Sequence, residues 1–474
     1  MLTRTLALCA ALIATPATAQ VEVAPLQALD FFSAGARDTG LPADLWTGSS
    51  GPVARAVIPT LGKKPLSPAA AAFGRRILST AATGPQGAGS DIDLAAARAQ
   101  ALIALGDAAS ANSILQRAPN PQNSASLSEA AAEAALIVGD DDRACQAANA
   151  LTAGRDAPYW LRLRAYCQFR AGQADAAQLT FSLANTAQRD AVYARLMGAV
   201  LAGSPPGAAS LRGGLDHALS RRLGLDLSPA LAGAHPAIVA QYQASTLASA
   251  ADMAAVAGAP EALAKRLLAA KGVGAFTLAA RSHAPLIAAM AASPATVVNP
   301  VLMARAAVAA GEVEAARAIR GAMVQDEIPG VTLTDLALLD ALIATAEGRI
   351  DGPTLDRLME RGAANGAKSP AQPAALLLAA LGTPMGPQAR AELATFEVAK
   401  GVASPAKLTA LDYAAEQGLK GETALVALSA AADAGANGPA PADRARIVRA
   451  LTRVGLADDA RAFAVEGLLA LQVK

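Results

Sequence analysis

The chain has 474 residues, of which 53% are hydrophobic, 17% charged and only 3% aromatic, and its net charge is +1 at pH 7. This apolar fraction excludes an intrinsically disordered chain, which needs low hydrophobicity or a high net charge. The balanced charge argues against nucleic acid as a partner, because binding phosphates requires a clustered cationic surplus. Alanine, the best intrinsic helix former, is the commonest residue type, so the composition favours an all-α protein.

Residues 1–19 have the features of a secretory signal peptide. Arg4 supplies the positive N-terminal region, and an apolar run follows at residues 6–13. The small residues Ala17 and Ala19 precede the predicted cleavage site before Gln20. The apolar run is far shorter than the ~20 residues needed to cross a bilayer. We therefore expect a periplasmic or secreted protein that has no stable membrane span after cleavage.

Residues 20–90 are expected to form a lead-in segment with short helices, because proline and glycine interrupt their helix-length runs. The stretch 81–90 (AATGPQGAGS) reads as a linker, and a periodic pattern begins after it. Three segments of this pattern, starting at residues 99, 132 and 165, align without gaps. Each has a small residue, a glycine seven positions later and an alanine five positions after that: Ala99/Gly106/Ala111, Ala132/Gly139/Ala144 and Ala165/Gly172/Ala177.

The spacing predicts a repeated helix–turn–helix unit. Each glycine closes a first helix, because the residue after a helix often needs a left-handed conformation. The polar residues that follow favour the start of a second helix, and the small residues mark where the two helices cross. A period of 33 residues with these marks resembles the tetratricopeptide repeat, and Phe181 and Ala184 also fit that family's pattern. The large aromatic residue early in the first helix is missing, since Leu161 stands there in the third unit.

The resemblance implies an α-solenoid of antiparallel helix pairs. We expect tetratricopeptide-like repeats over 91–205 and a degenerate helical-repeat region over 206–474. In the proteins it resembles, first-helix residues line a concave groove. The residues expected there carry side chains that are common at binding hot spots: Tyr159, Arg162, Tyr166, Phe169, Arg170 and, in the next unit, Tyr193.

Packing is the competing interpretation of the same residues. Glu129 and Glu133 occupy the equivalent places one repeat earlier, so Glu129 and Arg162 could form an ion pair between repeats. Phe169 could equally belong to the core. The sequence leaves both interpretations open.

Two cysteines remain once Cys9 is removed with the signal peptide. Cys145 lies early in the second helix of one unit, and Cys167 lies in the first helix of the next. Consecutive antiparallel helices bring these positions to nearly the same level, and an even cysteine count in an oxidising compartment favours pairing. We predict a Cys145–Cys167 disulfide, the alternative being two buried free thiols.

No catalytic, metal-binding or cofactor motif is present in the sequence. The three histidines, His217, His235 and His283, are far apart. We therefore expect a non-enzymatic protein without a cofactor: an exported, periplasmic helical-repeat scaffold that binds other envelope proteins through a concave surface. The alternative is a helical domain that binds or processes peptidoglycan or another envelope polymer.

Overall fold

The computed structural model describes residues 30–118, 121–245, 260–294, 297–323, 330–365 and 369–471. In these ranges the regular elements are α-helices and short 3₁₀ helices, and the β-type pairing is limited to two isolated bridges, Ala36–Thr80 and Ser50–Gln86. The described part of the chain is therefore all-α, as the composition predicts. None of its helices is long and apolar enough to cross a membrane. The predicted signal peptide, with its cleavage site before Gln20, lies outside the described residues.

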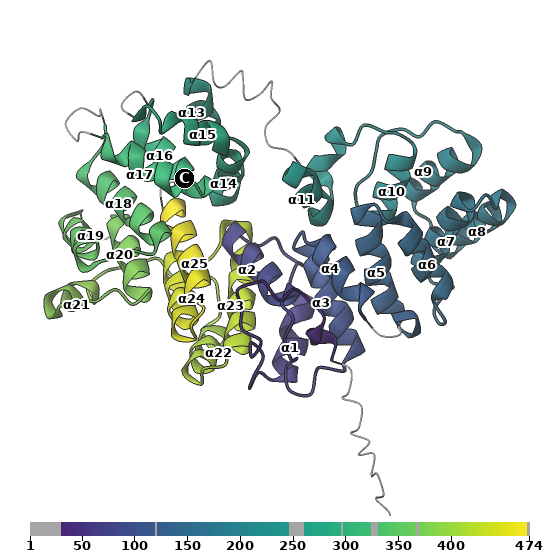
Figure 1. Ribbon diagram of the computed structural model, residues 1–474, viewed down its shortest axis with the longest axis horizontal. Coiled ribbons are helices and arrows are strands. Elements are labelled where there is room, and N and C mark those ends of the chain that lie inside the picture. The colour runs from purple at the N-terminus through teal and green to yellow at the C-terminus, as the bar shows by residue number, and fades with distance from the viewer. Residues whose placement is uncertain are drawn as a thin grey trace, which may run out of the picture.

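The first group of helices runs from the middle of the molecule to one end (Figure 1). In chain order these are α1 (Gly51–Val57), α2 (Pro68–Ser79), α3 (Ile92–Ala104), α4 (Ala108–Gln116), α5 (Ala125–Val138), α6 (Asp141–Ala150), α7 (Pro158–Arg170), α8 (Ala174–Ala187), α9 (Ala191–Ala202), α10 (Gly214–Arg222) and α11 (Pro236–Ser245). Helices α1 to α3 lie near the centre in Figure 1, and α7 to α9 lie at the far edge.

The second group fills the other half of the molecule and ends near the middle (Figure 1). It consists of α13 (Pro260–Ala269), α14 (Gly272–Ser282), α15 (Ala284–Met290), α16 (Pro300–Ala310), α17 (Val313–Gly321), α18 (Leu333–Glu347), α19 (Gly352–Asn365), α20 (Ala371–Ala380), α21 (Pro387–Leu393), α22 (Pro405–Glu416), α23 (Lys420–Ala434), α24 (Pro441–Arg453) and α25 (Ala457–Ala470). The group reaches its far edge at α19 and α21 in Figure 1, and its last helices lie beside α1 and α2.

The three predicted helix pairs are α3/α4, α5/α6 and α7/α8. Gly106, Gly139 and Gly172 follow the first helix of each pair with φ of 92°, 88° and 76°, a conformation that glycine adopts without strain. Asp107 and Asp140 then cap α4 and α6, since each carboxylate accepts a hydrogen bond from a backbone N–H three residues later. Local sequence thus sets where these helices end and begin.

The small residues of the three units lie buried between the paired helices, as their spacing predicts. They are Ala99, Ala111, Ala132, Ala144, Ala165 and Ala177. Because alanine has the smallest apolar side chain, the helix axes can approach to the short end of the usual ~8–10 Å range. A larger side chain at these points would separate the helices of the pair.

The segment before α3 belongs to a core that it shares with the end of the chain. Phe73 on α2 packs edge-on against Phe463 on α25, with ring centroids 6.1 Å apart. Trp46 is buried and lies so close to Gly421 on α23 that a Cβ there would clash with its ring. The predicted linker 81–90 is also fixed in place, because Ala88 is buried within the same core. Residues 30–90 therefore form part of the central core.

Helices on both sides of the predicted boundary at residue 205 pack together. Helix α10 contacts α5 and α9, and α11 contacts α3 and α5. The helices that follow residue 205 thus add directly to the first array. The division of the chain into 91–205 and 206–474 stays a prediction.

Candidate protein-binding face

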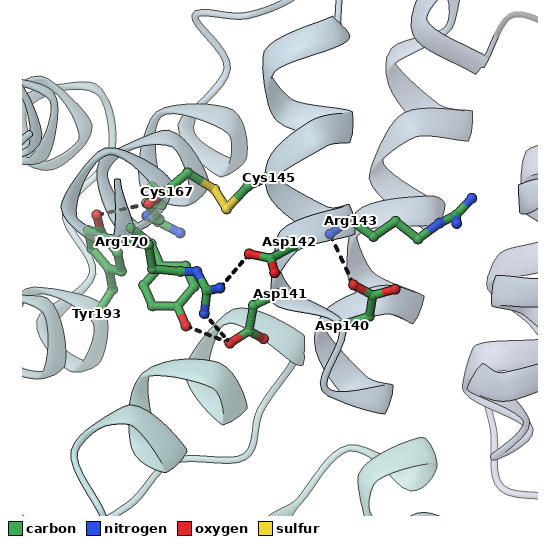
Figure 2. The surroundings of a disulfide bond; sticks show 10 residues. Asp140, Asp141, Asp142, Arg143, Cys145, Cys167, Arg170 and Tyr193 are labelled. Atoms are coloured by element: carbon green, nitrogen blue, oxygen red, sulfur yellow. Dashed lines mark hydrogen bonds and ion pairs between the residues drawn. A yellow bond between two sulfur atoms is a disulfide. The ribbon is translucent and has the colours of Figure 1, made fainter. Parts of the chain in front are cut away.

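Cys145 on α6 and Cys167 on α7 form the predicted disulfide, which joins two units of the array. Their sulfurs are bonded and their Cα atoms lie 5.4 Å apart, within the usual ~4.4–6.8 Å window (Figure 2). The two helices are antiparallel neighbours, so the two positions meet at one level. The cysteines are therefore bonded to each other and are not two free thiols.

Asp141, at the first position of α6, connects three helices. Its carboxylate accepts hydrogen bonds from the Tyr166 hydroxyl at 2.9 Å and from Arg170 Nη1 at 3.0 Å, both on α7. It also accepts one from Arg221 Nη2 on α10 at 2.8 Å. Arg170 reaches the neighbouring Asp142 as well, at 2.5 Å (Figure 2). A negative charge at this N-terminus also suits the α6 helix dipole.

Arg162 and Tyr193 form a second contact between α7 and α9. Arg162 Nη2 donates to the Gln188 carbonyl at 2.9 Å, and Nη1 lies 3.6 Å from the Asp190 carboxylate. The guanidinium carbon lies 5.6 Å from the centre of the Tyr193 ring, and the Tyr193 hydroxyl donates to the Arg162 carbonyl. Arg162 therefore pairs with Asp190 rather than with Glu129, which corrects the partner expected from the repeat spacing.

Helix α10 covers the face that these residues share. Leu215 and Leu219 belong to the same apolar cluster as Tyr166 and Tyr193. The Arg222 guanidinium lies 5.9 Å from the centre of the Phe169 ring. Of the residues predicted to line a groove, Phe169 is thus in direct contact with a helix of the same chain, and Tyr166 and Tyr193 share its apolar cluster.

The six predicted residues differ in how much of them solvent can reach. Tyr166 is 0% exposed and Tyr193 is 1% exposed, while Tyr159 and Phe169 are partly buried against the same cluster. The side chain of Arg170 is 30% exposed and that of Arg162 is 17% exposed. The structure therefore brings all six together, with Arg170 as the exposed member. Their role in binding a separate protein stays a prediction.

Glu133 on α5 holds the start of α10. Its Oε2 atom accepts a hydrogen bond from the Gly214 N–H at 2.6 Å. Burial raises the pKa of Glu133 to about 7, and the nearby carboxylates of Glu129 and Asp216 act in the same direction. Burial also raises the pKa of Tyr159, beside these two glutamates. Glu133 thus serves as a helix cap supplied from another helix.

Sequence reasoning missed the residues that complete this face. Arg221 and Arg222 are adjacent at the end of α10, and both contact the face. The run of acids at 140–142 was the available signal, because three adjacent carboxylates at a helix start attract arginines from neighbouring helices. Within the described ranges, no group of three or more His, Cys, Asp or Glu side chains is placed to hold a metal ion.

Comparison with known proteins identifies no relative: no protein-family model, no curated protein and no solved structure matches the chain. What this face does must therefore be inferred from its own contacts.

Proposed function

We propose that the chain is an exported scaffold of the bacterial envelope that binds other proteins at the concave face of an α-solenoid of tetratricopeptide-like helix pairs. One observation carries this proposal: the face formed by α5, α7 and α9 already holds a helix, α10. Helix α10 contributes two leucines to the shared apolar cluster, and its arginines lie against Asp141 and Phe169. An apolar stripe flanked by charge pairs is the usual means by which a groove holds a helix of a partner.

The disulfide and the leader-like N-terminus support export. Disulfides persist in oxidising compartments such as the periplasm and are rare where thiols are kept reduced. The Cys145–Cys167 bond joins the two helices that carry Asp141 and Arg170, so it also fixes the geometry of the face.

Site-specific photo-crosslinking in living cells tests the proposal. A photoreactive phenylalanine analogue replaces Arg170, which is on the accessible rim of the face. In a matched control it replaces Leu268, which is 68% exposed on α13 at the opposite end. We expect a discrete protein adduct from position 170 and none from position 268. The same adduct from both positions, or none from position 170, would refute binding at this face.

The alternative proposal is binding or processing of an envelope polymer. It draws on one observation: Glu129 and Glu133 lie one helical turn apart beside Tyr159, and burial raises the pKa of both carboxyl groups. Co-sedimentation with purified peptidoglycan sacculi distinguishes this alternative. Retention of the wild-type chain and loss of retention on Glu129→Gln would favour it over the scaffold.

A further inference from the structure

A cavity of about 470 Å³ lies far from this face, where α14, α20, α24 and α25 meet. The turn between α23 and α24, residues 435–440, forms one of its sides. The larger apolar side chains of the lining are Val273, Leu377 and Leu471, and prolines and alanines add to it. A concave, partly apolar site with a few polar groups is the usual form of a small-molecule site.

The charged side chains that line the cavity are both positive. Lys271 is exposed and makes no ion pair among the described residues, whereas the side chain of Arg444 is only 2% exposed. Arg444 donates through Nε to the Pro439 carbonyl at 3.1 Å and through Nη1 to Glu466 at 2.7 Å. Glu466 does not line the cavity, and it is shared with the Ala69 N–H. The lining thus contains two cations and no carboxylate.

Two helices begin at the cavity without a capping side chain. Lys271 precedes α14 and Ala440 precedes α24, and neither side chain accepts a hydrogen bond from the first turn. Pro441 at the first position of α24 has no N–H, so the free N–H groups there are those of the next residues of the turn. Such groups and the helix dipole both favour an anion. Asp443 lies in the first turn of α24, but its carboxylate accepts from the Ala403 N–H and is not part of the lining.

At three glycines the backbone lies close to groups that line the cavity. A Cβ on Gly467 would lie 2.5 Å from Arg444 Cδ, and one on Gly438 would lie 2.5 Å from Arg444 Nη2. A Cβ on Gly272 would lie 2.9 Å from the Asn437 side-chain oxygen. The backbone therefore comes close to these groups only because no side chain intervenes, as expected of a built site.

We propose that this cavity binds a small ligand that carries one carboxylate on a short apolar body. The carboxylate lies between Lys271 and Arg444, at the starts of α14 and α24, and the apolar body contacts Leu377 and Leu471. One unpaired cation, together with one arginine that Glu466 partly neutralises, suits a single negative charge better than the double charge of a phosphate. The site is independent of the proposed scaffold function.

The first test compares N-acetylleucine with its neutral amide, N-acetylleucinamide, by calorimetry or ligand-observed NMR. We expect the acid to bind with a Kd of about 1 mM or tighter and the amide to bind at least about tenfold more weakly. Lys271→Ala weakens binding of the acid about tenfold. The matched control, Lys265→Ala on α13, removes an exposed lysine outside the lining and leaves binding unchanged.

The second test introduces a carboxylate side chain of the protein itself at the site. Ala440→Asp caps α24, so the melting temperature stays the same or rises, and its charge repels the ligand, so binding is lost. Ala440→Asn supplies the same cap without the charge and keeps measurable binding. The proposal is overturned if wild type does not distinguish the acid from the amide, if Lys271→Ala and Lys265→Ala behave alike, or if Ala440→Asp binds as wild type does.

Discussion

Replacement of Glu133 by Gln is expected to remove a pH dependence from the docking of α10. The Glu133 carboxyl group has a pKa of about 7 in the folded chain, against an ordinary value of 4.5, chiefly because it is buried. The folded chain therefore keeps this proton in a pH range where the unfolded chain has lost it. The stabilisation from Glu133 is thus complete below about pH 4.5 and is lost as the pH rises through 7.

The size of this effect follows from the two pKa values. The difference between 4.5 and about 7 corresponds to about 3 kcal/mol. Although Glu133 is largely buried, part of its side chain still reaches solvent, and screening there reduces the expected effect to about 1–2 kcal/mol. Glutamine does not titrate, and its side-chain oxygen can still accept the hydrogen bond from the Gly214 N–H.

Hydrogen exchange of the α10 amides measures this local stability. At pH 5, wild type and Glu133→Gln should protect α10 equally. At pH 8.5, wild type should exchange roughly 5–30 times faster than the variant. Peptides from α24 in the same samples serve as the internal control and should not change. Greater protection of α10 in wild type at pH 8.5 would refute the reasoning, because the charge-assisted bond to Gly214 would then outweigh burial.

Three further predictions concern covalent and buried features. Replacing Cys145 and Cys167 by serine should lower the free energy of unfolding by about 3 kcal/mol, given their separation of 22 residues; an unchanged urea midpoint would contradict this. Arg98→Met should lower the free energy of unfolding by about 3–5 kcal/mol, because the buried Arg98 guanidinium donates to four backbone carbonyls. Thermal unfolding measures this loss against Arg117→Met, a control at an exposed arginine. Equal losses in the two variants would contradict the prediction. The mature chain should begin at Gln20, and an intact mass that corresponds to any other first residue would disprove that cleavage site.

The sequence predicts the helix pairs well because their determinants are local. A glycine with positive φ and an aspartate cap act within a few residues, so Gly106 with Asp107 and Gly139 with Asp140 mark helix ends that the structure reproduces. The disulfide could be predicted equally well, because the order of consecutive antiparallel helices determines which positions lie at the same height along the helix axes.

Contacts between segments that are far apart in the sequence could not be predicted from local patterns. Gly214 is 81 residues from Glu133, and no periodic pattern connects the two. The grouping of Arg162 with Tyr193 was predicted, but Asp190 as the partner of Arg162 was not, because the repeat spacing pointed to Glu129. The position of α10 over the face depends on the path of the connection after α9, which local propensity does not determine.

The shared core of residues 30–90 and α22–α25 joins segments that are synthesised far apart in time. The Ser50 N–H bonds to Glu422, 372 residues away, and Arg76 on α2 pairs with Asp459 on α25. Helix α2 can pack on α3 and α4 early, but the apolar side chains that α1 and α2 bury against α23 and α25 stay open to proteases until those helices emerge. A chain that stops before α25 leaves Phe73 without its partner ring. Closure of this joint thus requires α23 and α25, and a chain that lacks them leaves the core of residues 30–90 incomplete.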